Sequence, residues 1–287
     1  MLYILLPIIL WPLTWVILAK YGRKIGSYTT AFYRQFTIFI VSIFIVYSLF
    51  EKHTLLSEYS FYILGASISW FVYLISNFYS TNLLPFSVMR IFYDSSRMIF
   101  GLFLWYFFLS EQITFYDVVW IIFLFIGFYL FSLSRIDTSH LQIKNIPLWV
   151  TLSVVNGGLF IMSSYYFKLY AQAFSPMQAA VILEVLNGIC IGLFLLCILT
   201  FQQKNYFRIS LRDFMLFLCM APLSLFATYW LAKTYEFVSF YVINLLFILQ
   251  FVFSVFFSYL FLKEKLSYSQ IFPTIVIIVS LALIVLY

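Results

Sequence analysis

The chain alternates between long apolar runs and short polar breaks. Most of the runs are close to the ~20 residues that an α-helix needs to cross a hydrocarbon core of ~30 Å. Transmembrane β-strands would instead give alternating segments of about ten residues, and the sequence lacks that pattern. We therefore predict an all-α polytopic membrane protein with ten transmembrane helices. Their expected ranges are 2–19, 30–50, 60–80, 86–109, 116–134, 148–171, 176–201, 214–234, 239–262 and 269–287.

The composition agrees with a membrane location. Hydrophobic residues make up 65% of the 287 residues and charged residues only 9%, whereas soluble domains carry about 25% charged residues. The longest hydrophilic stretch, 135–145, is too short for a soluble domain. The net charge of +6 is spread among loops and does not indicate nucleic-acid binding. We expect a multi-pass protein of the bacterial inner (plasma) membrane.

The sequence repeats itself with an offset of 153 residues, which aligns 61–134 with 214–287 without a gap. The matches cluster where 100–114 lies over 253–267, and they include Glu111 over Glu264. This predicts two five-helix repeats in one membrane domain, 1–137 and 146–287, joined by a loop at 138–145. Because five is odd, the second repeat is inverted relative to the first, the plan of many carriers that work by alternating access.

The acidic turns that precede the last span of each half resemble those of a known family. They read Ser110-Glu111-Gln112-Ile113-Thr114 and Lys263-Glu264-Lys265-Leu266-Ser267. Together with ten spans and a five-plus-five repeat, they resemble the EamA-like ten-helix carriers of the drug/metabolite transporter superfamily. Gly127, where the family often has glycine, adds to the resemblance, although the second half has Ser280 there. The resemblance implies a secondary carrier of a small organic solute without a cofactor, with spans four and nine near the central cavity.

Charged residues inside span four indicate where a site lies. Arg90, Asp94 and Arg97 are spaced four and three residues apart, so they share one helical face. Charges in mid-membrane are costly and usually face a partner or a cavity. Arg97 has Gln250 as its repeat-mate in span nine, and a guanidinium there can bind a carboxylate. The alternative is that Asp94 only neutralises its arginine neighbours.

Other polar and aromatic residues in the spans are candidates for the same cavity, although each alone is as easily a packing residue. We predict substrate binding by Arg97, Asp94, Gln250, Tyr73, Trp70, Asn77, Tyr229, Trp230 and Asn156. Because an apolar environment disfavours a charged carboxyl group, Asp94 and Glu184 are the candidates for proton coupling. Glu184 could instead only hydrogen-bond a neighbouring helix. Arg34 and Lys168 lie nearer to span ends, where basic side chains can reach the interface.

These observations favour a secondary active transporter of a small polar or amphipathic metabolite. An amino acid or an amine is the favoured substrate, and proton-coupled export is one mode of transport that the sequence allows. The alternative is a non-transporting receptor or assembly protein on a transporter fold. Enzyme chemistry is not supported, because His53 and His140 fall in loops without metal-ligand spacing. Expected partners are the substrate, the lipid bilayer and protons, in a monomer or homodimer, with no metal, cofactor or nucleic acid.

The loop charges predict the orientation. Basic residues concentrate in loops one, five, seven and nine, whereas the even loops have little beyond Lys52 and Lys233. The positive-inside rule then places these odd loops in the cytoplasm and both termini outside.

Overall fold

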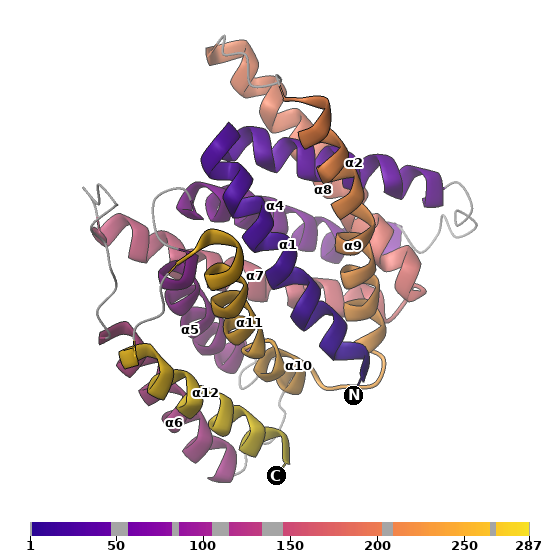
Figure 1. Cartoon of the computed structure of the whole chain (residues 1–287). Coiled ribbons are helices and arrows are strands. Elements are labelled where there is room, and N and C mark those ends of the chain that lie inside the picture. The colour runs from indigo at the N-terminus through magenta and orange to yellow at the C-terminus, as the bar shows by residue number, and fades with distance from the viewer. Residues whose placement is uncertain are drawn as a thin grey trace.

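The computed structural model describes residues 2–46, 57–81, 86–104, 115–133, 146–202, 209–264 and 268–286. Within these ranges all regular elements are helical, as the apolar pattern predicts (Figure 1). The elements are α1 (Leu2–Ile25), α2 (Ser27–Val46), α4 (Ser60–Thr81), α5 (Phe86–Leu104), α6 (Phe115–Leu133), α7 (Ile146–Ala171), α8 (Pro176–Gln202), α9 (Leu211–Thr234), α10 (Phe240–Leu246), α11 (Leu249–Phe257), the π-helix η2 (Ser258–Leu262) and α12 (Tyr268–Leu286). The predicted linking loop 138–145 and the turn 110–114 lie outside the described residues.

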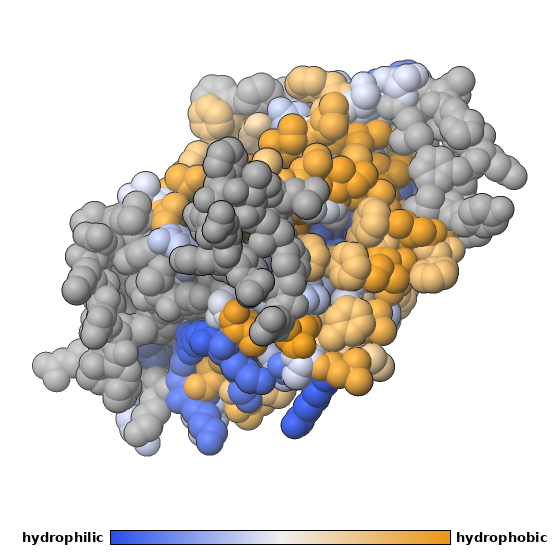
Figure 2. Space-filling view, turned by 90° about the horizontal axis from the view of Figure 1, so that it is seen from above, coloured by the Kyte–Doolittle hydropathy of each residue, from blue (hydrophilic) through white to orange (hydrophobic). Residues whose placement is uncertain are grey.

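The surface is that of an integral, multi-pass membrane protein. In the described part of the chain, six helical segments are long and apolar enough to cross a membrane, in α1, α2, α4, α8, α9 and the run from α10 to η2. Large apolar side chains point outward, including Phe44, Phe61, Phe115 and Phe272. In Figure 2 the coloured surface is hydrophobic over a broad area, and its most hydrophilic residues gather toward one edge. Such a surface is suited to contact with lipid.

The first helix is longer than the sequence pattern indicates. The expected span ends at residue 19, but α1 continues to Ile25 and carries Arg23 and Lys24 in its last turn. The chain then turns at Gly26, whose φ of 96° suits glycine, and α2 begins at the next residue. Three basic residues that we expected in a loop, at 20, 23 and 24, therefore extend from the helical end of α1.

The segment expected as one span at 239–262 is interrupted. Helix α10 ends at Leu246 and α11 begins at Leu249. Between them backbone N–H groups bond to the carbonyl three residues earlier instead of four. Ile248 N donates to Leu245 O and Gln250 N donates to Phe247 O, both at 3.0 Å. No proline or glycine marks this break. It places Phe247 in the turn and Gln250 at the start of α11.

The helices pack as a bundle with a separate pair at one side. Helix α7 packs on both α4 and α5, whereas α1 packs on α9 and α11. Helices α6 and α12 lie together at one edge (Figure 1). Gly127 permits their close approach, because a Cβ there would lie 2.7 Å from Ile277 Cγ1. The core of the larger group is aromatic, with Trp11, Trp70 and Phe160 buried in it.

Candidate functional site

The charged face of α5 is fully inside the bundle. Arg90 is 3% exposed, and Asp94 and Arg97 are 0% exposed. Asp94 Oδ1 lies 3.1 Å from Arg90 Nη2 and 3.5 Å from Arg97 Nη2. One carboxylate is therefore shared by two guanidinium groups. The face carries a net charge of +1, because two arginines oppose one aspartate.

Arg97 is enclosed by aromatic rings. Its guanidinium carbon lies 5.7 Å from the ring centre of Tyr93, 5.3 Å from that of Phe160 and 5.5 Å from that of Phe247. Such contacts stabilise a buried cation through the negative faces of the rings. The three rings come from α5, α7 and the break between α10 and α11. We call this group the Arg97 cage.

A hydrogen bond joins the cage to the far end of the sequence. Arg97 Nη1 donates to Gln250 Oε1 at 3.4 Å, and Gln250 Nε2 donates to Pro7 O at 3.5 Å. The two side chains are those that the 153-residue offset aligns. The neutral amide of Gln250 leaves the positive charge of Arg97 in place, with Asp94 as its charged partner.

Two aromatic candidates from the sequence lie beside the cage. Trp70 and Tyr73 on α4 are buried, and their ring centres lie 5.6 and 5.5 Å from that of Phe160. Tyr73 also lies 5.7 Å from Tyr93. Phe160 and Phe247 are the central residues that the sequence analysis missed, because phenylalanine in an apolar run gives no signal of its own. The one available clue is that Phe160 lies one helical turn after Asn156.

Two buried asparagines have unused hydrogen-bonding groups. Asn77 is 2% and Asn156 is 0% exposed. Within the described ranges, Asn77 Oδ1 and both amide atoms of Asn156 have no hydrogen-bond partner, and neither does Asp94 Oδ2. Buried polar groups are normally hydrogen-bonded. These atoms are therefore groups with which a polar ligand can bond.

Glu184 belongs to a second polar cluster instead of joining Asp94. Its Oε2 accepts from Gln35 Nε2 at 2.8 Å, and its Oε1 accepts from Thr228 Oγ1 at 3.1 Å. Gln35 also accepts from Arg34 Nη1 at 2.8 Å. Arg34 is only 5% exposed and lies 5.3 Å over the ring of Trp15, so it does not reach the interface as expected. Sequence spacing does not reveal this cluster, because its members come from α2, α8 and α9.

The second cluster is connected to the first through aromatic contacts. The ring of Trp15 lies 5.8 Å from that of Tyr73, which contacts Tyr93 of the Arg97 cage. Aromatic rings therefore run between the two groups of buried charges.

Tyr229 and Trp230 are not among the residues around Arg97. Their ring centres lie 6.1 and 5.6 Å from that of Phe226 on the same helix. Tyr229 also packs against a small cluster that includes Val181 and Leu225. Tyr229 therefore packs toward α8 and α2, and the role of Tyr229 and Trp230 in the cavity stays a prediction.

Ion pairs tie helix ends together at one end of the bundle. Arg23 Nη2 lies 3.1 Å from Glu264 Oε1, and Lys24 Nζ lies 3.2 Å from Asp213 Oδ2. Glu264 Oε1 also accepts from the backbone N–H of Phe86 at 3.0 Å. The acidic turn of the second half therefore holds the end of α1 and the start of α5.

Comparison with solved structures supports this fold. Sixteen chains match significantly. One is a crystal structure with a TM-score of 0.72, which is 14% identical and covers 99% of this chain and 96% of its own. At this identity the likeness shows the fold alone. No curated protein matches the chain.

A family model identifies the first half of the sequence. Residues 1–133 match the EamA-like transporter family, which confirms the resemblance drawn from the acidic turns and the span pattern. The matched region contains α1 to α6, and with them Arg90, Asp94 and Arg97. This match places residues 1–133 in the drug/metabolite transporter superfamily.

Proposed function

We propose that this protein is a secondary active transporter of a small polar or amphipathic metabolite in the bacterial inner membrane. The observation that carries the proposal is the hydrogen bond between Arg97 and Gln250, 3.4 Å long and buried inside the bundle. It joins the two segments of the sequence that repeat each other. A membrane interior retains such charges where they serve a pathway or a ligand.

Helix packing supports a mechanism of alternating access by ten spans in two inverted halves, 1–137 and 146–287. The repeat makes α1, α2, α4 and α5 of the first half equivalent to α7, α8, α9 and the α10–α11 segment of the second. The contact between α1 and α9 then has its equivalent in α4 with α7, that of α5 with α7 in α1 with α11, and that of α2 with α9 in α4 with α8. All six contacts are present. The break between α10 and α11 adjoins the cage, and broken helices are frequent at transporter sites. Rocking of the halves would open the cage to each side in turn.

An amino acid is the substrate class that best fits the buried groups, and amines come next. Arg97 offers a positive charge to a carboxylate, and one oxygen of Asp94 has no hydrogen-bond partner in the described residues, so it can receive an ammonium group. Trp70 and Tyr73 supply apolar faces for the organic part. A zwitterion satisfies both charged groups at once.

Proton coupling is proposed for Glu184 together with Asp94. In the described ranges, the carboxyl oxygens of Glu184 accept hydrogen bonds from Gln35 and Thr228, which are both uncharged. No basic side chain in the described ranges lies within 4.0 Å of it. Carboxyl groups buried inside transporter bundles often belong to proton relays.

The test is flux of radiolabelled amino acids and amines in proteoliposomes, with and without a pH gradient. We expect saturable flux in the wild type and loss of flux in Arg97→Gln, with Lys233→Gln at the far end of α9 as the matched control. Folding is checked by melting temperature. No flux over a broad panel of amino acids, amines and nucleosides would overturn the carrier proposal, and flux that is insensitive to the gradient would overturn the coupling.

A further inference from the structure

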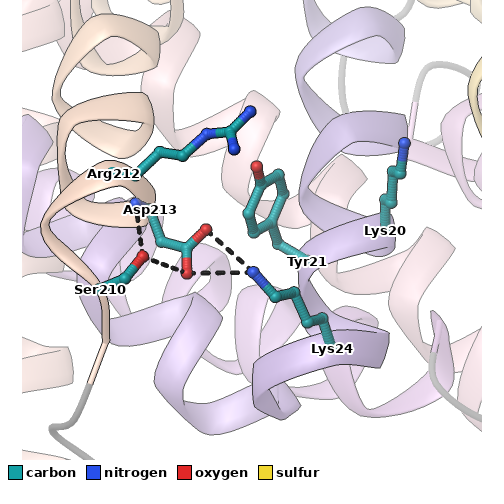
Figure 3. A pocket seen from close by; sticks show the side chains of 6 residues that line it. All are labelled: Lys20, Tyr21, Lys24, Ser210, Arg212 and Asp213. Carbon is teal, nitrogen blue, oxygen red and sulfur yellow. Dashed lines mark hydrogen bonds and ion pairs between the residues drawn. The ribbon is translucent and has the colours of Figure 1, made fainter.

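A pocket opens between the end of α1 and the start of α9, away from the Arg97 cage. Its volume is about 500 Å³. Six residues line it, and Figure 3 shows how they lie: Lys20, Tyr21, Lys24, Ser210, Arg212 and Asp213. Volumes of ~300–1,000 Å³ are typical of ligand sites. Neither the Arg97 cage nor the Glu184 cluster contributes to it.

The pocket is strongly positive because its single carboxylate is already occupied. Asp213 lies 3.2 Å from Lys24 Nζ through each of its oxygens, and Ser210 Oγ donates to it at 2.8 Å. Lys20 and Arg212 have no ion pair in the described part of the chain. Three cations and one anion leave a net charge of +2. Among the described residues, Lys20 and Arg212 make no salt bridge and offer their charges to an anion, although Arg212 also acts electrostatically on Asp213.

The backbone adds to this positive field. Helix α9 is 24 residues long and begins at the pocket, where Ser210 caps it by accepting from Asp213 N. The N-terminus of a helix carries partial positive charge and favours anions. In Figure 3 the guanidinium of Arg212 and the hydroxyl of Tyr21 point into the space between α1 and α9. A planar guanidinium with a hydroxyl donor beside it suits a phosphate group.

The surroundings favour a lipid as the source of that phosphate. Leu211 and Met215, one helical turn apart on α9, are 77% and 49% exposed and flank Arg212. An acyl chain can lie along these apolar side chains while its headgroup occupies the pocket. Both helices that form the pocket are apolar enough to cross a membrane, so it opens at their polar ends, near headgroup level. Basic pockets between transmembrane helices are suited to anionic headgroups.

We propose that this pocket binds a phosphate group, with an anionic phospholipid as its expected source. The inference is independent of the transported substrate, because none of its residues lies in the Arg97 cage. Bound lipid would rest against α1 and α9 together and would stabilise the end of the bundle at which Lys24 and Asp213 pair. The pocket is therefore a lipid site that strengthens the contact between the end of α1 and the start of α9.

The experiment measures retention of phosphatidylglycerol by the purified full-length chain, using native mass spectrometry in neutral detergent. Phosphatidylcholine serves as the lipid without net charge. We expect the wild type to retain phosphatidylglycerol and the double variant Lys20→Gln/Arg212→Gln to bind it about 25-fold more weakly, at about fivefold for each basic residue. Lys233→Gln, at the opposite end of α9, should bind as the wild type does. Both changed residues are exposed, so the variants should fold.

A second arm uses glycerol 3-phosphate and follows the melting temperature. If phosphatidylglycerol or glycerol 3-phosphate raises the melting temperature of the wild type but not of the double variant, the phosphate site is supported. The compound that stabilises the protein identifies the source of the phosphate group. Arg212→Lys, which keeps the charge but loses the guanidinium plane, should bind with intermediate strength. Equal binding by wild type and double variant, equal retention of the uncharged lipid, or no response to either compound overturns the proposal.

Discussion

Replacing Asp94 with asparagine removes the carboxylate that lies between two buried arginines. The change is nearly isosteric, so it alters charge far more than shape. Asp94 is 0% exposed and lies 3.1 Å from Arg90 and 3.5 Å from Arg97. The net charge of the α5 face rises from +1 to +2. Removing one partner of a buried ion pair typically costs about 3–5 kcal/mol. We therefore expect the free energy of unfolding to fall by roughly 3–5 kcal/mol.

The size of the effect can be measured by thermal unfolding of purified protein. At roughly 2–4 °C per kcal/mol, the melting temperature of Asp94→Asn should fall by roughly 6–20 °C. The double variant Arg90→Gln/Asp94→Asn restores the net charge of +1. It should therefore lose less stability than the sum of the single variants, by roughly 0.5–3 kcal/mol.

Two outcomes would refute this reasoning. If Asp94→Asn melts within 2 °C of the wild type, the carboxylate does not balance the arginines. If the two single changes add without coupling, Arg90 and Asp94 act separately in spite of their distance. Flux measured on the same samples then separates function from stability, because the double variant restores charge balance while the acidic group stays absent.

Glu184→Gln keeps both hydrogen bonds within reach but removes the titratable group, so flux should lose its response to a pH gradient while the melting temperature changes little; a preserved response would assign Glu184 a packing role. Gly157→Ala should lower the melting temperature, at a cost of roughly 1–3 kcal/mol, because its Cβ would lie 2.6 Å from a backbone oxygen of α5. Gly192→Ala is the control, because its Cβ meets nothing within 4 Å, and equal losses would contradict the packing argument. Arg23→Gln breaks the ion pair with Glu264, in which the Arg23 side chain is 36% and the Glu264 side chain 17% exposed. Because the pair is partly exposed, its loss should lower the free energy of unfolding by at most about 1 kcal/mol, measured in the same melting assay.

The sequence predicts those parts of the molecule that local periodicity determines. The spacing of Arg90, Asp94 and Arg97 gives one helical face, and the structure places all three side chains on it, in contact through Asp94. The apolar runs likewise give most helix positions, because the length of a membrane crossing is set by the bilayer. The internal repeat points to Gln250, since aligned positions in two halves can meet at their interface.

Contacts between residues of different helices are decided by tertiary packing. The spacing of residues along the chain does not reveal them. Phe160 and Phe247 surround Arg97 because α7 and the α10–α11 break pack against α5. Gln35 and Glu184 meet across 149 positions of sequence. Tyr229 has the right chemistry for a cavity, but its helix turns it toward α8 and α2. The break after Leu246 has neither proline nor glycine to announce it.

The charged face of α5 also sets an order for synthesis and membrane insertion. Helix α5 holds three charged residues near its middle, Arg90, Asp94 and Arg97, which makes its insertion into the membrane costly. Its internal ion pairs can form as soon as the helix does, since they link positions three and four apart. The ring contacts of Arg97 with Phe160 and Phe247 and its hydrogen bond to Gln250, 153 residues later, form only when α7 and then α10 and α11 have left the ribosome. Until then Arg97 has its contacts within α5 but lacks those from α7 and the second half, and α5 depends on the insertion machinery or on earlier helices to keep its place.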